Sequence, residues 1–107
     1  MTIDSTPLTI ERTGGILRLA PRTDLVASAV EDLRAALLDA MAEPGPAVVL
    51  DLVAVEVLDS LGITLILGLF RSSQKAGAAF SIQNVRPDLM RVFRLFNLTK
   101  FFPVNEA

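Results

Sequence analysis

The sequence contains no histidine, cysteine, tryptophan or tyrosine. Without histidine and cysteine, the chain lacks the side chains of a serine–histidine nucleophile, a cysteine protease or a thiolate or imidazole metal site, and it cannot form a disulfide. The residues that remain offer little means of activating a nucleophile or cradling a triphosphate. We therefore expect neither an enzyme nor a bound metal or other cofactor.

A basic cluster and a long apolar run are also missing. The net charge is only −2, and a nucleic-acid partner would demand a basic patch that releases counterions from phosphates. The longest apolar run, 61–70, is too short and too interrupted to span a bilayer, and residues 1–7 lack the basic start and apolar stretch of a signal peptide. These features predict a cytoplasmic protein with no nucleic-acid partner and no membrane insertion.

The chain does have enough apolar sequence for one core. It has 107 residues, of which 51% are hydrophobic, and a chain of this size buries roughly two-thirds of its unfolded surface. No repeat, low-complexity segment or shift in composition marks a second domain. We expect a single domain over residues 1–107.

Apolar periodicity and turn residues divide this domain into strands and helices. Alternation of apolar and polar residues predicts a hairpin over 8–20, with its turn at Gly14-Gly15. Further strands are predicted over 47–52, 78–84 and 101–104, and helices over 27–42, 60–76 and 87–96. The order β-β-α-β-α-β-α-β indicates an α/β fold, in which helices pack mainly on one face of a mixed, mostly parallel sheet.

The helix over 60–76 has more apolar residues than one buried face needs. One stripe has the spacing that packs a helix on a sheet, and it comprises Ile63, Ile66, Leu67 and Phe70. A second stripe, formed by Leu61, Leu65 and Leu69, points elsewhere. Either the helix is sandwiched inside its own domain, or the second stripe is a docking face for another protein.

Ser60 stands at the start of this helix, directly after Asp59. As a helix cap, its hydroxyl oxygen would accept a hydrogen bond from an N–H group of the first turn, and local physics favours this role. As a phosphoserine, it would bring nearly two negative charges to the positive end of the helix dipole, beside apolar contact surface. Phosphate there would repel a partner rather than rearrange the domain.

The start of the helix also resembles a known segment. It reads Asp59-Ser60-Leu61-Gly62-Ile63-Thr64-Leu65-Ile66-Leu67-Gly68, which is similar to the Asp-Ser-(Ser/Thr)-Gly-Leu-Gly-x-x-x-Gly segment of STAS domains, specifically of bacterial anti-sigma factor antagonists. Asp51-Leu52, Lys75-Ala76-Gly77 and the stretch from Pro87 to Phe102 agree with that family. The resemblance covers about residues 8–104 and implies one STAS domain with its core in that range. Leu61 and Thr64 depart from the family pattern.

The resemblance implies a regulatory binding protein switched by phosphorylation at Ser60. In that family the unphosphorylated antagonist binds an anti-sigma factor that is also a serine kinase, the phosphorylated form is released, and a serine phosphatase restores it. Asp24 corresponds to an acidic residue that contacts the kinase, although by itself it is as well suited to start the helix over 27–42. The expected partner-binding residues are Asp24, Asp59, Ser60, Leu61, Gly62, Thr64, Leu65 and Leu69.

A second hypothesis is a constitutive STAS domain, which would serve as a scaffold of a stress-sensing complex or as an accessory subunit of a lipid-transport ATPase. In that case the helix over 60–76 stays bound to a partner protein permanently, and Ser60 is only a helix cap.

Three further groups of residues have weaker functional claims. Gly14-Gly15 and Pro44-Gly45-Pro46 are expected to be turns, because no Gly-Lys-Ser/Thr follows either of them as in a phosphate loop. The basic residues of the third helix, Arg86, Arg91 and Arg94, are expected on its solvated face, where they also suit a phosphate or an acidic partner. The aromatic residues Phe93, Phe96, Phe101 and Phe102 are expected to pack in the core, with a ligand groove as the alternative.

Overall fold

The computed structural model describes residues 2–5 and 7–107. Its strands are β1 (Thr2–Ser5), β2 (Leu8–Thr13), β3 (Ile16–Pro21), β4 (Ala47–Asp51), β5 (Ala79–Val85) and β6 (Val104–Glu106). Its helices are α1 (Ala27–Ala40), α2 (Ser60–Lys75), α3 (Pro87–Leu95) and the short 3-10 helix η1 (Leu98–Lys100). The helices and the internal strands agree with the sequence-based bounds to within two residues.

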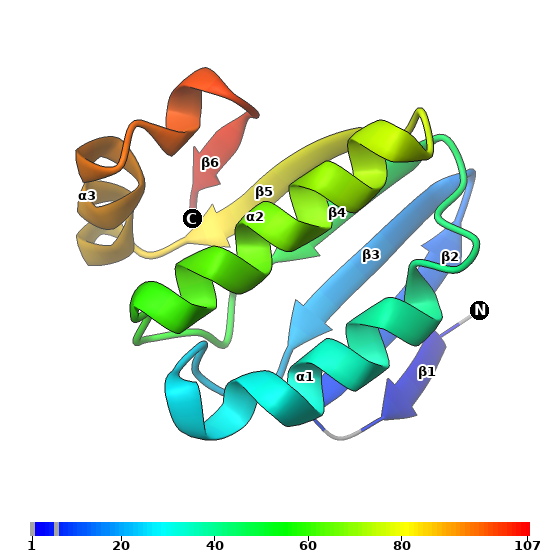
Figure 1. The fold of residues 1–107 in the computed structure, drawn as a ribbon, viewed down its shortest axis with the longest axis horizontal. Coiled ribbons are helices and arrows are strands. Elements are labelled where there is room, and N and C mark those ends of the chain that lie inside the picture. Colours follow the sequence, from blue (N-terminus) through cyan, green and yellow to red (C-terminus); the bar gives the residue numbers. More distant parts are fainter. Residues whose placement is uncertain (1, 6) are drawn as a thin grey trace.

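The strands form one six-stranded sheet in chain order, from β1 to β6. The first two pairs are antiparallel, and β3, β4, β5 and β6 run parallel to one another. A parallel pair needs a crossover connection, and α1 and α2 supply two of them. Figure 1 shows α1 and α2 side by side in front of the sheet, with α3 beside β6. The predicted α/β fold, with helices mainly on one face of a mixed sheet, is therefore confirmed.

The core lies between the sheet and the two helices that cover it. Leu19, Leu50 and Ile82 stand in register on β3, β4 and β5, and all three are almost fully buried. Leu33 of α1 and Ile66 of α2 are fully buried as well and belong to the same apolar cluster. This packing fixes α2 on the sheet, and with it the position of the residues at the start of α2.

The face of the sheet away from α1 and α2 is polar at its centre. The guanidinium of Arg18 donates hydrogen bonds to Asp51 Oδ2 at 3.3 Å and to Gln83 Oε1 at 3.1 Å. The side-chain amide of Asn84 donates to Asp51 Oδ1 at 3.0 Å. Antiparallel and mixed sheets commonly leave such a face in contact with water.

The structure differs from the sequence-based expectation at both ends of the sheet. β1 was not predicted, because Thr2–Ser5 lacks an alternating apolar pattern and joins the sheet by pairing with β2. The last strand was expected over 101–104, but it begins at Val104, after a 3-10 turn. The carbonyl of Pro103 accepts a hydrogen bond from the Ile82 N–H at 2.9 Å, and pairing with β5 begins there and continues to Glu106. The expected edge position is correct.

The aromatic residues near the carboxyl end divide between core and surface. Phe93 and Phe102 are buried as expected, and the Phe102 ring lies 5.1 Å from the ring of Phe80. Phe96 and Phe101 are 52% and 60% exposed, so the expectation of core packing is wrong for these two. They line a groove of ≈ 370 Å³ between η1 and α2.

Candidate phosphorylation and partner-binding site

Two loops meet where the parallel strands end. One, residues 22–26, follows β3, and the other, residues 52–59, leads from β4 into α2. The Leu25 N–H donates to the Val57 carbonyl at 3.0 Å, and the Asp59 N–H donates to the Leu25 carbonyl at 3.1 Å. The first loop therefore supports the backbone from which α2 starts.

Asp59 is the residue that caps α2. Its Oδ1 accepts hydrogen bonds from the N–H groups of Leu61 and Gly62, both at 3.0 Å, and its Oδ2 accepts one from the Ala27 N–H at 2.8 Å. The bonds from Gly62 and Ala27, and to a lesser degree that from Leu61, hold the pKa of the Asp59 carboxyl below its ordinary value. One carboxylate thus closes the start of α2 and ties it to the start of α1.

Ser60 does not act as a cap, so that interpretation of its hydroxyl is wrong. It is the first residue of α2, its side chain is exposed, and its Oγ makes no hydrogen bond to any of the residues that the structure describes. Its carbonyl accepts a hydrogen bond from Thr64 Oγ1 at 3.0 Å. Because Asp59 does the capping, the Ser60 hydroxyl is left free and open to solvent.

Gly62 is a packing residue of this site rather than a contact surface. It is buried, and a Cβ atom placed on it would lie 2.1 Å from the Leu25 carbonyl oxygen. A Cβ contact shorter than 3.0 Å forces neighbouring atoms to move. Gly62 therefore allows the first turn of α2 to rest directly on the loop after β3.

Asp24 has a role that neither interpretation of the sequence anticipated. Its Oδ1 accepts hydrogen bonds from the N–H groups of Glu56 and Val57, at 2.8 and 3.1 Å. The residue at the start of α1 is Val26, which makes no side-chain cap, so Asp24 does not start this helix. Asp24 instead holds the loop before α2 against the loop after β3, and its contact with a partner stays a prediction.

The second apolar stripe of α2 is not a continuous docking face. Leu65 and Leu69 are only 8% and 5% exposed and belong to the core cluster, whereas Leu61 is 47% exposed. The sandwiched interpretation is correct for Leu65 and Leu69, which are buried in the core, and Figure 1 shows α1 lying beside α2. Of the eight predicted contact residues, Leu61, Ser60 and Thr64 are exposed at the surface.

Sequence reasoning missed two exposed apolar residues in the loop that enters α2. Val53 and Val57 are both more than half exposed. Three valines within five residues of a loop, Val53, Val55 and Val57, were the available signal, and only Val55 is buried. Val57 stands three residues before Ser60, so the free hydroxyl has an exposed apolar residue on each side in the sequence, Val57 and Leu61.

The basic residues of α3 lie at the surface, as expected. Arg91 and Arg94 are exposed, and Arg86 reaches back to the loop before α2, where its guanidinium lies 3.8 Å from the Glu56 carboxylate. Because both partners of this ion pair are largely exposed, it contributes little stability. It does place a cation beside the loop that precedes Ser60.

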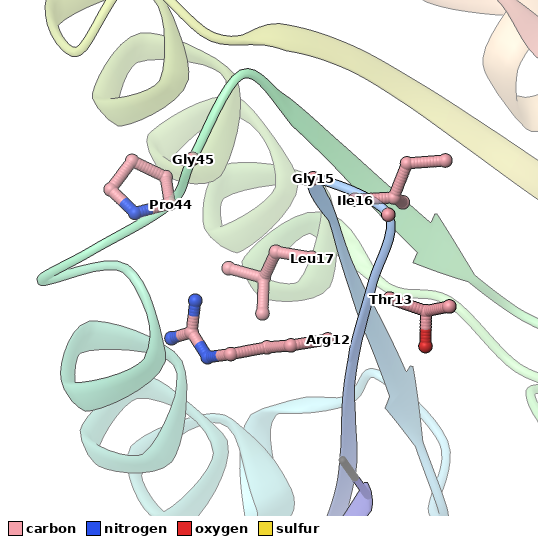
Figure 2. A pocket seen from close by; sticks show the side chains of 8 residues that line it. Arg12, Thr13, Gly15, Ile16, Leu17, Pro44 and Gly45 are labelled. Carbon is pink, nitrogen blue, oxygen red and sulfur yellow. The ribbon is translucent and has the colours of Figure 1, made fainter.

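The opposite edge of the sheet carries a second cavity, of ≈ 280 Å³. Figure 2 shows Arg12 reaching from β2 towards the end of α1, below the turn that contains Pro44 and Gly45. Its guanidinium donates hydrogen bonds to the Ala40 carbonyl at 2.9 Å and to the Glu43 carbonyl. Gly15 and Gly45 both adopt positive φ, as turn residues do, so the segments resembling phosphate loops are turns.

In the part of the chain that the structure describes, no helix combines the length and apolar character needed to cross a membrane. Among the same residues, no group of three or more carboxylates is gathered in a way that could hold a metal ion.

The family model for the STAS domain matches residues 7–107. An anti-sigma factor antagonist from Mycobacterium paratuberculosis is 25% identical to this chain, with a TM-score of 0.83, and the match covers 94% of this chain and 85% of that one. The anti-sigma factor antagonist SpoIIAA, in its unphosphorylated form, is 22% identical, with a TM-score of 0.68 and coverages of 94% and 87%. None of the curated proteins matches the sequence.

A sulfate transporter family protein from Wolinella succinogenes has the same fold as well. It is 17% identical, with a TM-score of 0.76, and the match covers 91% of this chain and 81% of that one. An anti-sigma factor antagonist and a sulfate transporter family protein therefore share this architecture, and the fold alone does not distinguish between their functions.

Proposed function

The chain belongs to the STAS domain family, and on that basis we propose that it is an anti-sigma factor antagonist switched by phosphorylation of Ser60. With Ser60 unphosphorylated, it binds an anti-sigma factor that is also a serine kinase. With phosphate on Ser60 it is released, and a serine phosphatase restores it. The chain itself catalyses no reaction in this proposal. The similarity to an antagonist from Mycobacterium paratuberculosis over 94% of the chain supports the assignment.

The observation that carries the proposal is the free hydroxyl of Ser60. A kinase needs a serine whose Oγ is exposed and not engaged in the fold. Ser60 meets both conditions among the described residues, because Asp59 accepts the hydrogen bonds of the first turn in its place. Modification of the hydroxyl therefore costs the domain no hydrogen bond of its own.

Phosphate on Ser60 would stay at the surface instead of being neutralised by the helix. The N–H groups of Leu61 and Gly62 already donate to the Asp59 side chain, and the Ile63 N–H donates to the Asp59 carbonyl. The added charge of nearly −2 therefore stands next to the Asp59 carboxylate, at the point where Val57 and Leu61 are exposed. We expect this charge to act on the partner and not on the fold.

The size of this effect is sufficient for a switch. Like charges juxtaposed at an interface cost several kcal/mol, and each 1.4 kcal/mol changes the dissociation constant about tenfold. A phosphate that meets an acidic or apolar partner surface thus lowers the affinity by two orders of magnitude or more.

Substitution of Ser60 tests the proposal. Purified wild type, Ser60→Ala and Ser60→Asp are each titrated against the cognate kinase, with and without ATP, and binding is measured by calorimetry. We expect Ser60→Ala to stay bound throughout and Ser60→Asp to bind at least tenfold more weakly than wild type without ATP. Thr99→Asp is the matched control, because it adds the same charge at an exposed residue of η1. If Ser60→Asp binds as tightly as wild type, the proposed switch is wrong.

A constitutive accessory role is the second candidate, and the similarity to a sulfate transporter family protein favours it. In this case the helix docks permanently, and substitutions at Ser60 leave the complex intact. The sequence-based form of this hypothesis assigned the capping of α2 to Ser60, but Asp59 caps this helix in the structure. Neighbouring genes separate the two candidates, since a histidine-kinase-like ATPase or serine phosphatase favours the switch and a permease favours the accessory role.

A further inference from the structure

A second surface lies beside the Ser60 site, between the two helices that cover the sheet. The α1–α2 groove, as we name it, has a volume of ≈ 590 Å³ and runs between residues 34–41, at the end of α1, and residues 64–72 of α2. Leu37, Leu65 and Leu69 form its floor and are almost fully buried, so the exposed apolar surface of the groove is centred on Leu38. We infer that this groove binds an acidic amphipathic helix of a partner protein, through contacts that do not require phosphorylation of Ser60.

The length and direction of the groove suit a helix. Its walls span eight residues of chain on one side, 34–41, and nine on the other, 64–72, which is about 12 Å or two helical turns. The two helices run side by side in the same direction (Figure 1), and a third helix can lie along the groove between them. No strand edge borders the groove, so an extended peptide would leave its backbone groups unpaired, whereas a helix satisfies its own.

Gly68 is the residue that opens the middle of the groove. It lines the groove in the interior of α2, and a Cβ atom placed on it would meet nothing within 4 Å. Glycine is among the least favourable residues in a helix interior, and the packing of this chain on itself does not require one here. The open space instead permits close approach of a second backbone. Gly62, in the same helix, differs because its own chain fills that space.

The charged residues of the lining specify an acidic occupant. Arg34 and Arg71 are the two charged lining residues, and both are exposed. Arg34 lies near the start of the α1 wall and Arg71 near the end of the α2 wall, so they mark opposite ends and opposite sides of the groove. The only ion pair of Arg34 among the described residues is with Glu31, at 4.0 Å on the helix surface, where such pairs are weak. A helix with one acidic residue on each flank, about nine residues apart, would meet both arginines, because positions with that spacing lie on opposite sides of a helix.

Two other occupants fit these features less well. A fatty acid has one anionic group and would leave one of the two arginines unused. A second copy of this chain fits less well through α3, because the exposed Leu95 has Arg91 and Arg94 in the same helix. Like charges would then meet Arg34 and Arg71.

Synthetic helices provide the probe. Two stapled peptides of about 14 residues carry the same leucine face, one with glutamate and one with lysine at the two flanking positions. Their binding to the full chain is measured by fluorescence polarisation at low salt, where charge pairing is strongest. We expect the glutamate peptide to bind at least tenfold more tightly than the lysine peptide.

Variants of the chain locate and identify the contact. Arg34→Glu combined with Arg71→Glu should reverse the preference, so that the lysine peptide binds more tightly. Arg91→Glu combined with Arg94→Glu makes the same charge change on α3 and should leave the preference unchanged. Gly68→Leu fills the groove and should remove binding of both peptides, while circular dichroism shows that the helices are retained. Gly68→Ala, a smaller filling, should weaken binding less.

Other outcomes overturn the inference. Equal binding of the two peptides, no binding at about 1 mM peptide, or a preference that the arginine variants do not reverse would each exclude an acidic helix. Binding of dodecanoate that Gly68→Leu abolishes, in the absence of peptide binding, would assign the groove to a lipid. A dimer in sedimentation that Gly68→Leu dissociates would assign it to a second copy. Every peptide measurement uses unphosphorylated protein. A negative result for the groove therefore does not bear on the proposed phosphorylation switch at Ser60.

Discussion

Arg12 and Asp59 both bind the ends of helices, but they lie at opposite edges of the sheet and leave different surfaces behind. At the edge where β3 and β4 begin, the Arg12 guanidinium donates hydrogen bonds to the Ala40 and Glu43 carbonyls at the end of α1. At the edge where these strands end, the Asp59 carboxylate accepts hydrogen bonds from the N–H groups at the start of α2. The second edge also presents the free Ser60 hydroxyl beside the exposed Val57 and Leu61, whereas the free hydroxyl of the first edge, that of Thr13, directly precedes the Gly14-Gly15 turn.

This difference shows how a helix end that only stabilises the fold can be distinguished from one that also carries a functional residue. A polar residue whose hydrogen bonds are all made within the fold is explained by the fold. Ser60 is not explained in this way, since its neighbour performs the capping and its own Oγ faces solvent between two exposed apolar residues. Substitutions at the two edges should therefore differ in their effects on stability and on phosphorylation of Ser60.

Substitution of the two α2 glycines should give effects of opposite sign. Gly62→Ala places a methyl group against the Leu25 carbonyl and should lower the free energy of unfolding by about 3 kcal/mol or more. Gly68→Ala, in open space of the same helix, is the control and should raise it by about 0.5–1 kcal/mol. Urea unfolding measures both. An unchanged midpoint for Gly62→Ala would show that α2 is not seated on the loop after β3.

Removal of the Asp59 carboxylate should destabilise the protein in a pH-dependent way. The N–H groups of Gly62 and Ala27 hold the pKa of folded Asp59 below its ordinary value of 3.8, so the folded state binds fewer protons than the unfolded state as the pH falls. The stability from this group is present above that value and is lost as the pH falls through the folded pKa. Asp59→Asn should therefore cost most at neutral pH and progressively less below pH 3.8.

Urea unfolding of wild type and Asp59→Asn over a series of pH values measures this difference. Ser60→Ala is the control, because serine does not titrate, and its difference from wild type should stay flat. A constant deficit for Asp59→Asn down to the most acid conditions would contradict the capping role of the carboxylate.

Arg12→Met tests the other edge. The loss of two hydrogen bonds to exposed or partly buried carbonyls should lower the free energy of unfolding by about 1 kcal/mol. Phosphorylation of Ser60 by the cognate kinase should proceed at the wild-type rate, because Arg12 lies at the far edge of the sheet. A large fall in phosphorylation without unfolding would break the separation between the two edges.

The smallest effect on stability is expected from Ser60→Ala. Since the Ser60 hydroxyl makes no hydrogen bond to the described residues, its removal should change the free energy of unfolding by no more than about 0.5 kcal/mol. Thermal unfolding followed by circular dichroism measures this. A loss of 1 kcal/mol or more, typical for the removal of a helix cap, would mean that Ser60 contributes to the start of α2 after all.

The fold could be predicted well because its elements carry local signals. Pro44 to Pro46 and Gly77 mark the ends of helices, and alternation marks the hairpin of β2 and β3. β1 and β6 could not be placed correctly, because short edge strands are defined by backbone pairing with a neighbour and not by side-chain pattern. The burial of Leu65 and Leu69 likewise depends on how closely α1 lies beside α2, which the periodicity of one helix does not contain.

The candidate site was predicted in outline and not in its chemistry. The sequence drew attention to Asp59 and Ser60, yet either residue can cap a helix, and only the geometry shows that the aspartate does so. The role of Asp24 depends on a contact with the backbone of Glu56 and Val57, some thirty residues later in the chain. No local pattern could have shown that contact.

The most direct test of the central claim is phosphosite mapping of the protein isolated from its native cells, with and without phosphatase treatment. Mass spectrometry of proteolytic peptides should find phosphate on Ser60, removed by the phosphatase, and unmodified Thr64 in the same peptide. Because Thr64 Oγ1 is held by the Ser60 carbonyl while Ser60 Oγ is free, the two hydroxyls should differ in this way. Phosphate on Thr64 or elsewhere, with Ser60 unmodified under every condition in which the kinase is active, would contradict the account.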